Sequence, residues 1–305
     1  MCQISVHKHS IRGMVSLLGS GATAACAVLS FRTSQFAGAN SFLLNLERKF
    51  KNICSILSKT RESTMPFFEQ QDTKIHYEES GAGFPVLLFA AGGMRSAISF
   101  WEGSPFNPIT FLSPHFRVIA MDQRNAGQST APVSAEDGWH SYTADHLALL
   151  DHLQIDRCHL LGGCIGGPYC FGVMQAAPDR VAAAVLQQTI GYDDNKQAFY
   201  DMFDGWAAGL KESRPEVEEA AWSSFRSNMY DGDFVFNVSR DFVRSCTTPL
   251  LVLMGSDLYH PEVTSREVAD LAPNAQLVEE WKEPDQIDQT INTITEFLKL
   301  NTPGN

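Results

Sequence analysis

The chain has 305 residues and 44% apolar content, enough for one large domain with a sizeable core, or for one domain and an extra segment. Its net charge of −12 lacks the basic footprint that nucleic-acid binding requires, so we exclude a nucleic-acid partner. The seven cysteines are an odd number without framework spacing, which predicts free thiols in a reducing, intracellular setting, and no C-x-x-C pair or His/Cys cluster predicts a metal site.

The charge is unevenly distributed, because residues 1–64 contain eight Lys or Arg against two Asp or Glu. This basic leader has no acidic residue before Glu47 and is rich in Ser, Ala and Gly. Three interpretations stay open: a disordered leader before a native start at Met65, a mitochondrial presequence, or a weak signal or membrane segment within residues 13–31. The Gly, Ser and Thr content of residues 13–31 makes that segment a poor candidate for a membrane span. We therefore expect a cytoplasmic protein, or a mitochondrial one if the leader targets it, without stable membrane insertion.

The body, residues 65–305, alternates short apolar runs with helical patterns, which predicts a parallel sheet with helices on both faces. The expected strands are 74–78, 85–90, 116–121, 158–162, 181–187, 250–255 and 276–281. The expected helices are 141–153, 165–177 and a last one in which Ile287, Ile291, Ile294 and Leu298 recur at helical spacing. Runs such as "VLLF" and "LLVLM" suit central strands that are buried on both sides.

Residues 191–248 interrupt this alternation. They contain no strong strand pattern and are expected to form two or three helices, with many aromatic residues. An insertion of this length between two strands predicts a lid. So aromatic a lid is expected to present some of its rings to a pocket, although each ring taken alone is more simply a packing residue.

Three motifs follow one another along the body. "MDQRNAGQS", residues 121–129, comes directly after a predicted strand, and "GGCIGG", residues 162–167, lies between a strand and a helix. "PLLVLMGSDLYHP", residues 249–261, places Asp257 after the next-to-last strand. Over residues 70–300 these motifs resemble, in order and spacing, the α/β-hydrolase superfamily. Asn125 stands where that family's D-x-R-G loop has glycine, and Cys164 stands where its G-x-S-x-G elbow has serine.

The resemblance implies an α/β-hydrolase fold: a mostly parallel eight-stranded sheet flanked by helices, with a helical lid and no cofactor. It also implies that Asp257 is the acid of a catalytic triad. One oxyanion donor would be the backbone N–H of Ile165, and the second that of Gly92 or Gly93 in the loop after an early strand.

The residues around Cys164 are suited to a nucleophile elbow that carries a cysteine. A nucleophile held between a strand and a helix needs small neighbours, and Gly162, Gly166 and Gly167 leave that room. A thiol has a pKa of roughly 8.5, so some thiolate exists near neutral pH without a strong base. Cys164 is therefore predicted to be the nucleophile, although a cysteine could also fill the elbow of an inactive protein.

The expected base is missing from its usual place. The family carries a histidine after the last strand, but "LVEEWKEPDQIDQ", residues 277–289, contains none. Among the nine histidines, His260 stands out because it follows Asp257 by three residues at the carboxyl edge of the sheet. A role as a cap before Pro261 is an equal alternative, and His140 is the reserve candidate.

The pattern as a whole predicts a cofactor-independent hydrolase in which Cys164, His260 and Asp257 act on an ester, lactone or thioester of modest size. The aromatic lid favours a mainly apolar small-molecule substrate. Two alternatives stay open: an acyltransferase, and a non-catalytic ligand-binding protein on a hydrolase scaffold. The residues do not indicate an oligomeric state.

Overall fold

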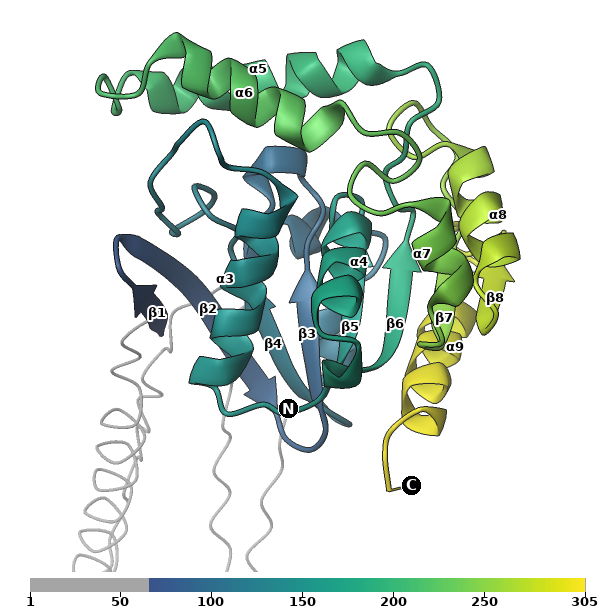
Figure 1. Ribbon diagram of the computed structural model, residues 1–305. Helices are drawn as coiled ribbons and strands as arrows, with labels where there is room; N and C mark the ends of the chain where they lie inside the picture. Colours follow the sequence, from purple (N-terminus) through teal and green to yellow (C-terminus); the bar gives the residue numbers. More distant parts are fainter. Residues whose placement is uncertain (1–65, 305) are drawn as a thin grey trace, which may run out of the picture. The chain divides into compact units, whose positions relative to one another are not determined.

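The computed structural model describes residues 66–304, so the interpretations of the leader fall outside the described part (Figure 1). The body contains one eight-stranded sheet with the order β1-β2-β4-β3-β5-β6-β7-β8. The strands are β1 (Phe67–Gln70), β2 (Thr73–Gly81), β3 (Pro85–Phe89), β4 (Arg117–Met121), β5 (Cys158–Gly163), β6 (Val181–Gln187), β7 (Leu250–Leu253) and β8 (Ala275–Val278). Only the pairs β1–β2 and β2–β4 are antiparallel, which confirms the predicted fold class.

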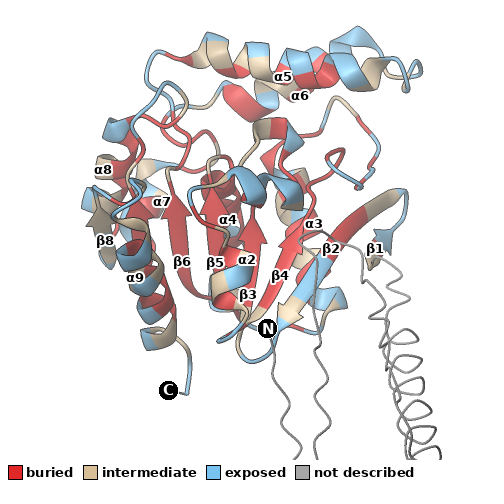
Figure 2. Ribbon diagram, turned by 180° about the vertical axis from the view of Figure 1, so that it is seen from behind, coloured by how far each residue is buried: buried red, intermediate tan, exposed pale blue. Residues whose placement is uncertain are grey.

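The central strands form because their residues are apolar on both faces. Every residue of β5, β6 and β7 is buried, and the buried colour runs through the middle of the sheet (Figure 2). Such strands need helices on each side to exclude water. All seven predicted strands are confirmed, with ends that shift by up to three residues.

Helices cover both faces of the sheet. On one face, α3 (Trp139–His152), α4 (Gly166–Ala176) and α8 (Glu262–Leu271) contribute to the larger core cluster. On the other, α2 (Pro108–Leu112) and α9 (Ile287–Leu300) bury Leu112, Ile294 and Leu298 against the smaller cluster. Both faces of the sheet are therefore closed, and the carboxyl edge of the parallel strands is the place left for a site.

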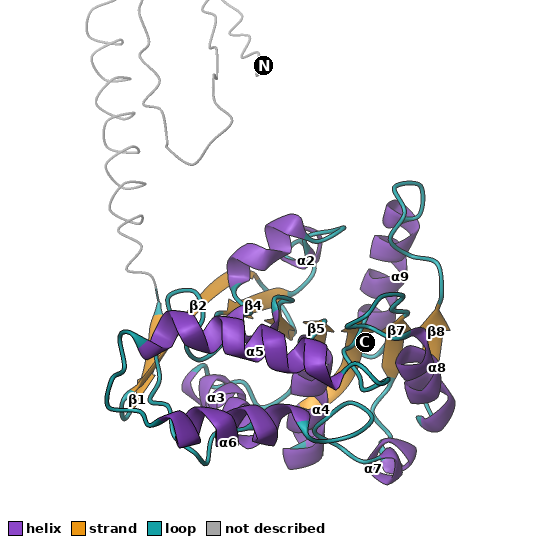
Figure 3. Ribbon diagram, turned by 90° about the horizontal axis from the view of Figure 1, so that it is seen from above, coloured by secondary structure: helices purple, strands orange, loops and turns teal. Residues whose placement is uncertain are grey.

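The segment 191–248 forms three helices, α5 (Lys196–Lys211), α6 (Glu219–Tyr230) and α7 (Arg240–Ser245). The pair α5 and α6 lies across the ends toward which β3, β5 and β6 point, as Figures 1 and 3 show from two directions. The aromatic side chains of this segment are mostly buried and contact one another edge to face. Most of them pack α5 and α6 onto the body, and of these rings Trp206 and Phe236 also border clefts.

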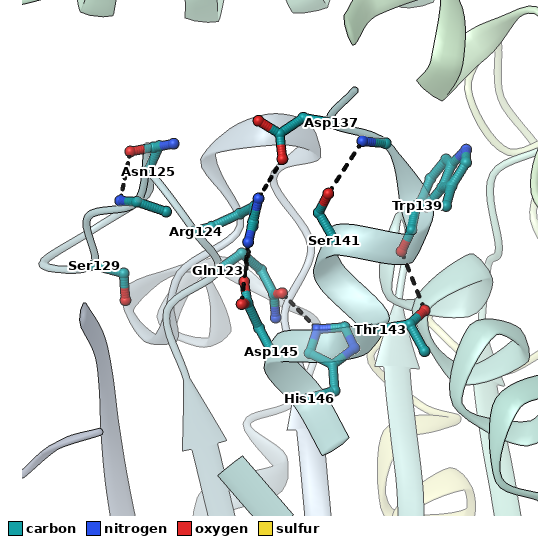
Figure 4. Close-up of polar contacts among 12 residues, drawn as sticks. Gln123, Arg124, Asn125, Ser129, Asp137, Trp139, Ser141, Thr143, Asp145 and His146 are labelled. Atoms are coloured by element: carbon teal, nitrogen blue, oxygen red, sulfur yellow. Dashed lines mark hydrogen bonds and ion pairs between the residues drawn. The ribbon is translucent and has the colours of Figure 1, made fainter. Parts of the chain in front are cut away.

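The loop after β4 fastens α5 to the body. Asn125 adopts the left-handed conformation (φ 57°), which explains how it can replace a glycine. Its backbone carbonyl accepts a hydrogen bond from Trp206 Nε1 at 3.1 Å, and its Oδ1 accepts one from Arg214 Nη2 at 2.9 Å. Figure 4 shows how the same loop is anchored to the body: Arg124 binds the carboxylates of Asp137 and Asp145. The substitution of glycine thus adds a side-chain contact between the loop and the segment that leads from α5 to α6.

Within residues 66–304, no helix combines the length and apolar character needed to cross a membrane.

Candidate active site

Cys164 sits at a strained bend between β5 and α4. Its φ is 58°, in the left-handed region that side chains disfavour. Its N–H donates to the carbonyl of Gln187 at 2.9 Å, and its own carbonyl accepts from the N–H of Gly167 at 3.1 Å. The bend is thus fixed by the end of β6 on one side and by the first turn of α4 on the other.

The elbow glycines are required by close packing. A Cβ at Gly162 would lie 2.1 Å from the carbonyl oxygen of Gly166, and one at Gly166 would lie 2.5 Å from that of Phe89. A Cβ at Gly167 would lie 1.9 Å from Oγ1 of Thr189. The three glycines predicted to shape the elbow therefore occupy positions where even one methyl group collides.

We expect Gly167→Ala to destabilise the fold by about 1–3 kcal/mol, because the methyl group overpacks a buried contact. Thermal unfolding followed by circular dichroism measures the effect. Gly205→Ala, in α5, is the matched control: its Cβ would have no atom within 4 Å. The control should raise stability by roughly 0.5–1 kcal/mol, since alanine favours a helix interior. Equal melting temperatures for Gly167→Ala and the unchanged protein would contradict the close packing described above.

Asp257 and His260 share one turn after β7. The N–H of His260 donates to the backbone carbonyl of Asp257 at 3.1 Å, and the N–H of Asp257 donates to the carbonyl of His260 at 3.2 Å. The carboxylate accepts a hydrogen bond from His260 Nδ1, with Oδ2 at 2.8 Å. Gly255 makes the turn feasible, because a Cβ there would lie 2.4 Å from the carbonyl oxygen of His260. The acid thus orients the imidazole of a residue only three positions away.

The His260 ring interacts with the Cys164 thiol. Its Nε2 is buried and forms no hydrogen bond with the described residues. Catalytic hydrogen bonds are often long or poorly aligned before substrate binds. The structure thus brings together the three residues that the sequence singled out, in the order Asp257, His260, Cys164.

The electrostatics of the pair favour a thiolate and an imidazolium. Burial alone would raise the pKa of the Cys164 thiol, but hydrogen bonding and charge attraction from His260, with backbone N–H groups, lower it overall. Burial likewise opposes protonation of His260, but Cys164 and then Asp257 raise the pKa of the ring to about 9. Interaction with His260 also outweighs burial at Asp257, so the pKa of that carboxyl is lowered. Both shifts therefore run toward a thiolate at Cys164 beside a protonated ring at His260.

Two backbone N–H groups, those of Ile165 and Gly92, interact with the same sulfur, and both lower the pKa of the Cys164 thiol. Gly92 has φ 117°, and a Cβ there would lie 2.9 Å from the ring of Phe100. Of the two glycines considered as second donor, Gly92 therefore faces the sulfur, while a Cβ at Gly93 would meet Sδ of Met202 at 2.6 Å. N–H groups so placed can stabilise negative charge beside Cys164.

Comparison with known proteins agrees with the fold. A family model described as alpha/beta hydrolase fold matches residues 85–233. The crystal structure of the enol-lactonase from Burkholderia xenovorans LB400 superposes with a TM-score of 0.57 at 22% identity, covering 77% of this chain and 100% of that chain. This chain belongs to the α/β-hydrolase superfamily.

Among curated relatives of this α/β-hydrolase, the "Putative carbamate hydrolase RutD" of Stutzerimonas stutzeri is 24% identical over 233 residues, covering 67% of this chain and 86% of that protein. The 2-hydroxy-6-oxo-2,4-heptadienoate hydrolase of Pseudomonas putida is 29% identical over 150 residues, covering 48% of this chain and 50% of that protein. The carboxyl-terminal part is where the chain departs from the family pattern. β8 runs into α9 with no histidine, and the imidazole near the nucleophile comes from the turn after β7 instead.

The remaining histidines of the described part lie elsewhere. His140 is exposed and borders a cleft between α3 and α4 whose lining does not include Cys164. His146 and His159 are buried, and burial lowers the pKa of each ring, to about 3 and about 4 respectively. His140 therefore has no structural support as the base in this α/β-hydrolase.

A cavity of about 420 Å³ opens beside Cys164. It is bordered by Ser99, Phe100, Ser104, Gln187 and Gln188, and its lining includes no Asp, Glu, Lys, Arg or His. The aromatic residues expected to face the substrate do not line this cavity. Three larger clefts, of about 760, 790 and 530 Å³, do not have Cys164 in their lining. We take the smaller cavity as the candidate site because it contains the reactive group.

Sequence analysis missed Gln187 and Ser104 as site residues. The signal for Gln187 was present: two glutamines, Gln187 and Gln188, directly follow the apolar run "VAAAVL" at the carboxyl edge of the sheet. A polar side chain at that edge can face a site. Ser104 follows a short 3₁₀ helix, Ile98–Gly103, that carried no recognisable pattern.

Proposed function

We propose that this α/β-hydrolase is a cofactor-independent hydrolase that uses Cys164 to cleave a small ester, lactone or thioester. The observation that carries the proposal is the line from the Asp257 carboxylate through the His260 ring to the Cys164 sulfur. The printed names of the relatives, which include hydrolases of a carbamate and of an enol-lactone, are consistent with attack on a carbonyl group. An inert scaffold would have no need for a replacement histidine oriented by Asp257.

The first half of the reaction forms an acyl-enzyme. The Cys164 thiolate attacks the carbonyl carbon, and the charge that moves to the carbonyl oxygen is stabilised by the N–H groups of Gly92 and Ile165. Imidazolium at His260 then gives its proton to the leaving alkoxide or thiolate as the carbon–leaving-group bond breaks. In the thiolate–imidazolium form that the two pKa shifts favour, the histidine acts first as an acid and not as a base.

The second half restores the thiolate. Neutral His260 takes a proton from water while the water oxygen attacks the thioester carbon, and the same two N–H groups stabilise the new oxyanion. The carbon–sulfur bond breaks, the carboxylic acid leaves, and the ring, once more an imidazolium, faces a thiolate. Asp257 stabilises that charge and fixes the ring tautomer, as its hydrogen bond to Nδ1 allows.

The cavity also bears on substrate size. A volume of about 420 Å³ with an uncharged lining suits a small neutral acyl compound. We propose that α5 and α6 act as the lid of this site. Their aromatic rings support the lid's attachment rather than the binding of an apolar substrate.

A transient acyl-enzyme tests the proposal. With p-nitrophenyl acetate, we expect a stoichiometric burst of p-nitrophenol, with an acetyl group on Cys164 detected by mass spectrometry of the intact protein and its peptides. Cys164→Ala should abolish both signals, because no nucleophile remains. Cys246→Ala, at a buried cysteine of the core, is the control and should retain them. Binding of the ester without burst or turnover would support the binding-protein alternative instead.

A further inference from the structure

Gln187 carries an unpaired polar atom in the candidate site. It is the last residue of β6, it lines the cavity beside Cys164, and only 3% of its surface is exposed. Its Nε2 donates a hydrogen bond to Ser104 Oγ at 3.2 Å. Its Oε1 is buried and finds no hydrogen-bond partner among residues 66–304. Buried polar atoms are almost always paired, so an unpaired one on a residue that lines a cavity indicates a ligand group that pairs with it.

The position of this amide is fixed relative to the nucleophile. The backbone carbonyl of Gln187 accepts the N–H of Cys164 at 2.9 Å, so the two residues are tied together directly. A Cβ at Gly163 would lie 3.6 Å from Oε1, which places the amide oxygen against the residue that precedes the nucleophile. Because Gln187 and Cys164 line the same cavity, a bound molecule whose carbonyl carbon reached Cys164 would lie beside the Gln187 amide.

The chemistry of the partner follows from the amide and from the cavity. A carbonyl oxygen accepts hydrogen bonds and donates none, so the partner must supply an N–H or an O–H. Apart from the Cys164 sulfur, which loses its charge when it bonds to the carbonyl carbon, the cavity lining contains no charged side chain to pair with an ionic group. A neutral donor therefore matches the site better than an ammonium group, because an unpaired charge would lose its hydration without compensation.

We propose that Gln187 is a specificity-determining residue whose Oε1 accepts a hydrogen bond from a neutral N–H or O–H group next to the reacting carbonyl of the substrate. The substrate class is then an N-acylamino or hydroxy ester, lactone or thioester, rather than a plain alkyl one. Ser104 holds the amide in place through Nε2 and is a positioning residue. This inference rests on the proposed function, since it concerns the substrate of the same site.

Matched p-nitrophenyl esters test the inference. One pair is N-acetylglycine and N-acetylsarcosine, which differ only in a methyl group that replaces the N–H. The other is hydroxyacetate and methoxyacetate, which differ in the O–H. We expect the unmodified protein to hydrolyse the donor member of at least one pair with a kcat/KM about tenfold or more above that of its methylated partner, and the pair that responds identifies the donor.

Two variants assign the preference to the amide. Gln187→Met keeps the length of the side chain without the acceptor and should bring the ratio within each pair close to one, whatever it does to the absolute rates. Gln188→Met makes the same change at the neighbouring cavity residue and should keep the ratio. A preference that survives in a folded Gln187→Met protein would overturn the inference.

If Gln187→Met fails to fold, the rates of the unmodified protein with the four esters still decide the test. Ratios near one in both pairs, with all four esters hydrolysed, would overturn the inference and leave the proposed function standing. Failure to hydrolyse any ester would overturn both.

Discussion

Replacing His260 by alanine is expected to lower kcat/KM for ester hydrolysis by about 10²–10⁴-fold, the range typical for loss of a general acid–base group. The loss should be greater for an alkyl ester than for a p-nitrophenyl ester, because an alkoxide needs a proton to leave and p-nitrophenolate does not. With both substrates, the variant also lacks the base that removes a proton from water in the second half-reaction. Steady-state rates with the two esters, together with the burst phase, measure these effects separately.

His140→Ala is the control for this experiment, since His140 is exposed and borders a different cleft. It should leave kcat/KM unchanged within twofold. Added imidazole should partly restore the His260→Ala protein if the missing ring is the cause. Unchanged hydrolysis in the His260→Ala protein would remove this residue from the mechanism.

Alkylation of Cys164 by iodoacetamide should proceed with a midpoint below the usual thiol value of roughly 8.5, and faster than at the other six cysteines. The reason is that His260 and two backbone N–H groups lower the pKa of the thiol despite its burial. In the His260→Ala protein the opposing interaction disappears while burial remains, so the midpoint should move above the usual value. The thiolate–imidazolium pair itself should persist up to about pH 9, where the ring loses its proton.

Labelling rates across a pH series, with the modified peptide identified by mass spectrometry, measure this shift. Cys158 provides an internal reference: burial raises the pKa of its thiol to about 12, so it should stay unlabelled until the protein unfolds. Equal labelling of all cysteines, or a midpoint that does not respond to the loss of His260, would contradict the paired charges described for the site.

The sequence predicted most of the sheet because strands buried on both faces are continuous apolar runs. β6, "VAAAVLQ", is found at the predicted residues, since no helical or alternating pattern competes with it. β1 was missed because its four residues pair only with β2, across a two-residue turn at Gln71 that lacks glycine. α8 was not predicted at all. Its residues bury Val268 on one side and otherwise resemble a polar loop.

The candidate site was predictable in its residues but not in its proton positions. The spacing of Asp257 and His260 suggested that both lie near Cys164, and the structure places them together. The sequence could not show that a protonated ring is favoured, because that depends on the burial of the pair and on the N–H groups of Gly92 and Ile165. The orientation of the aromatic residues in α5 and α6 could not be predicted either, since composition does not say which rings contact one another.

Because the acid and the imidazole share one turn after β7, neither of them is supplied by β8 or α9. In this protein Asp257 and His260 are joined by backbone hydrogen bonds within four residues, so their relative geometry does not depend on how β8 leads into α9. The connection between β8 and α9 still supports that turn from outside, because Trp281 donates to the carbonyl of Met254 and Lys282 to the hydroxyl of Ser256. An insertion beyond these two residues should therefore leave the hydrogen bonds between Asp257 and His260 intact, a separation that family members with their histidine in this connection lack.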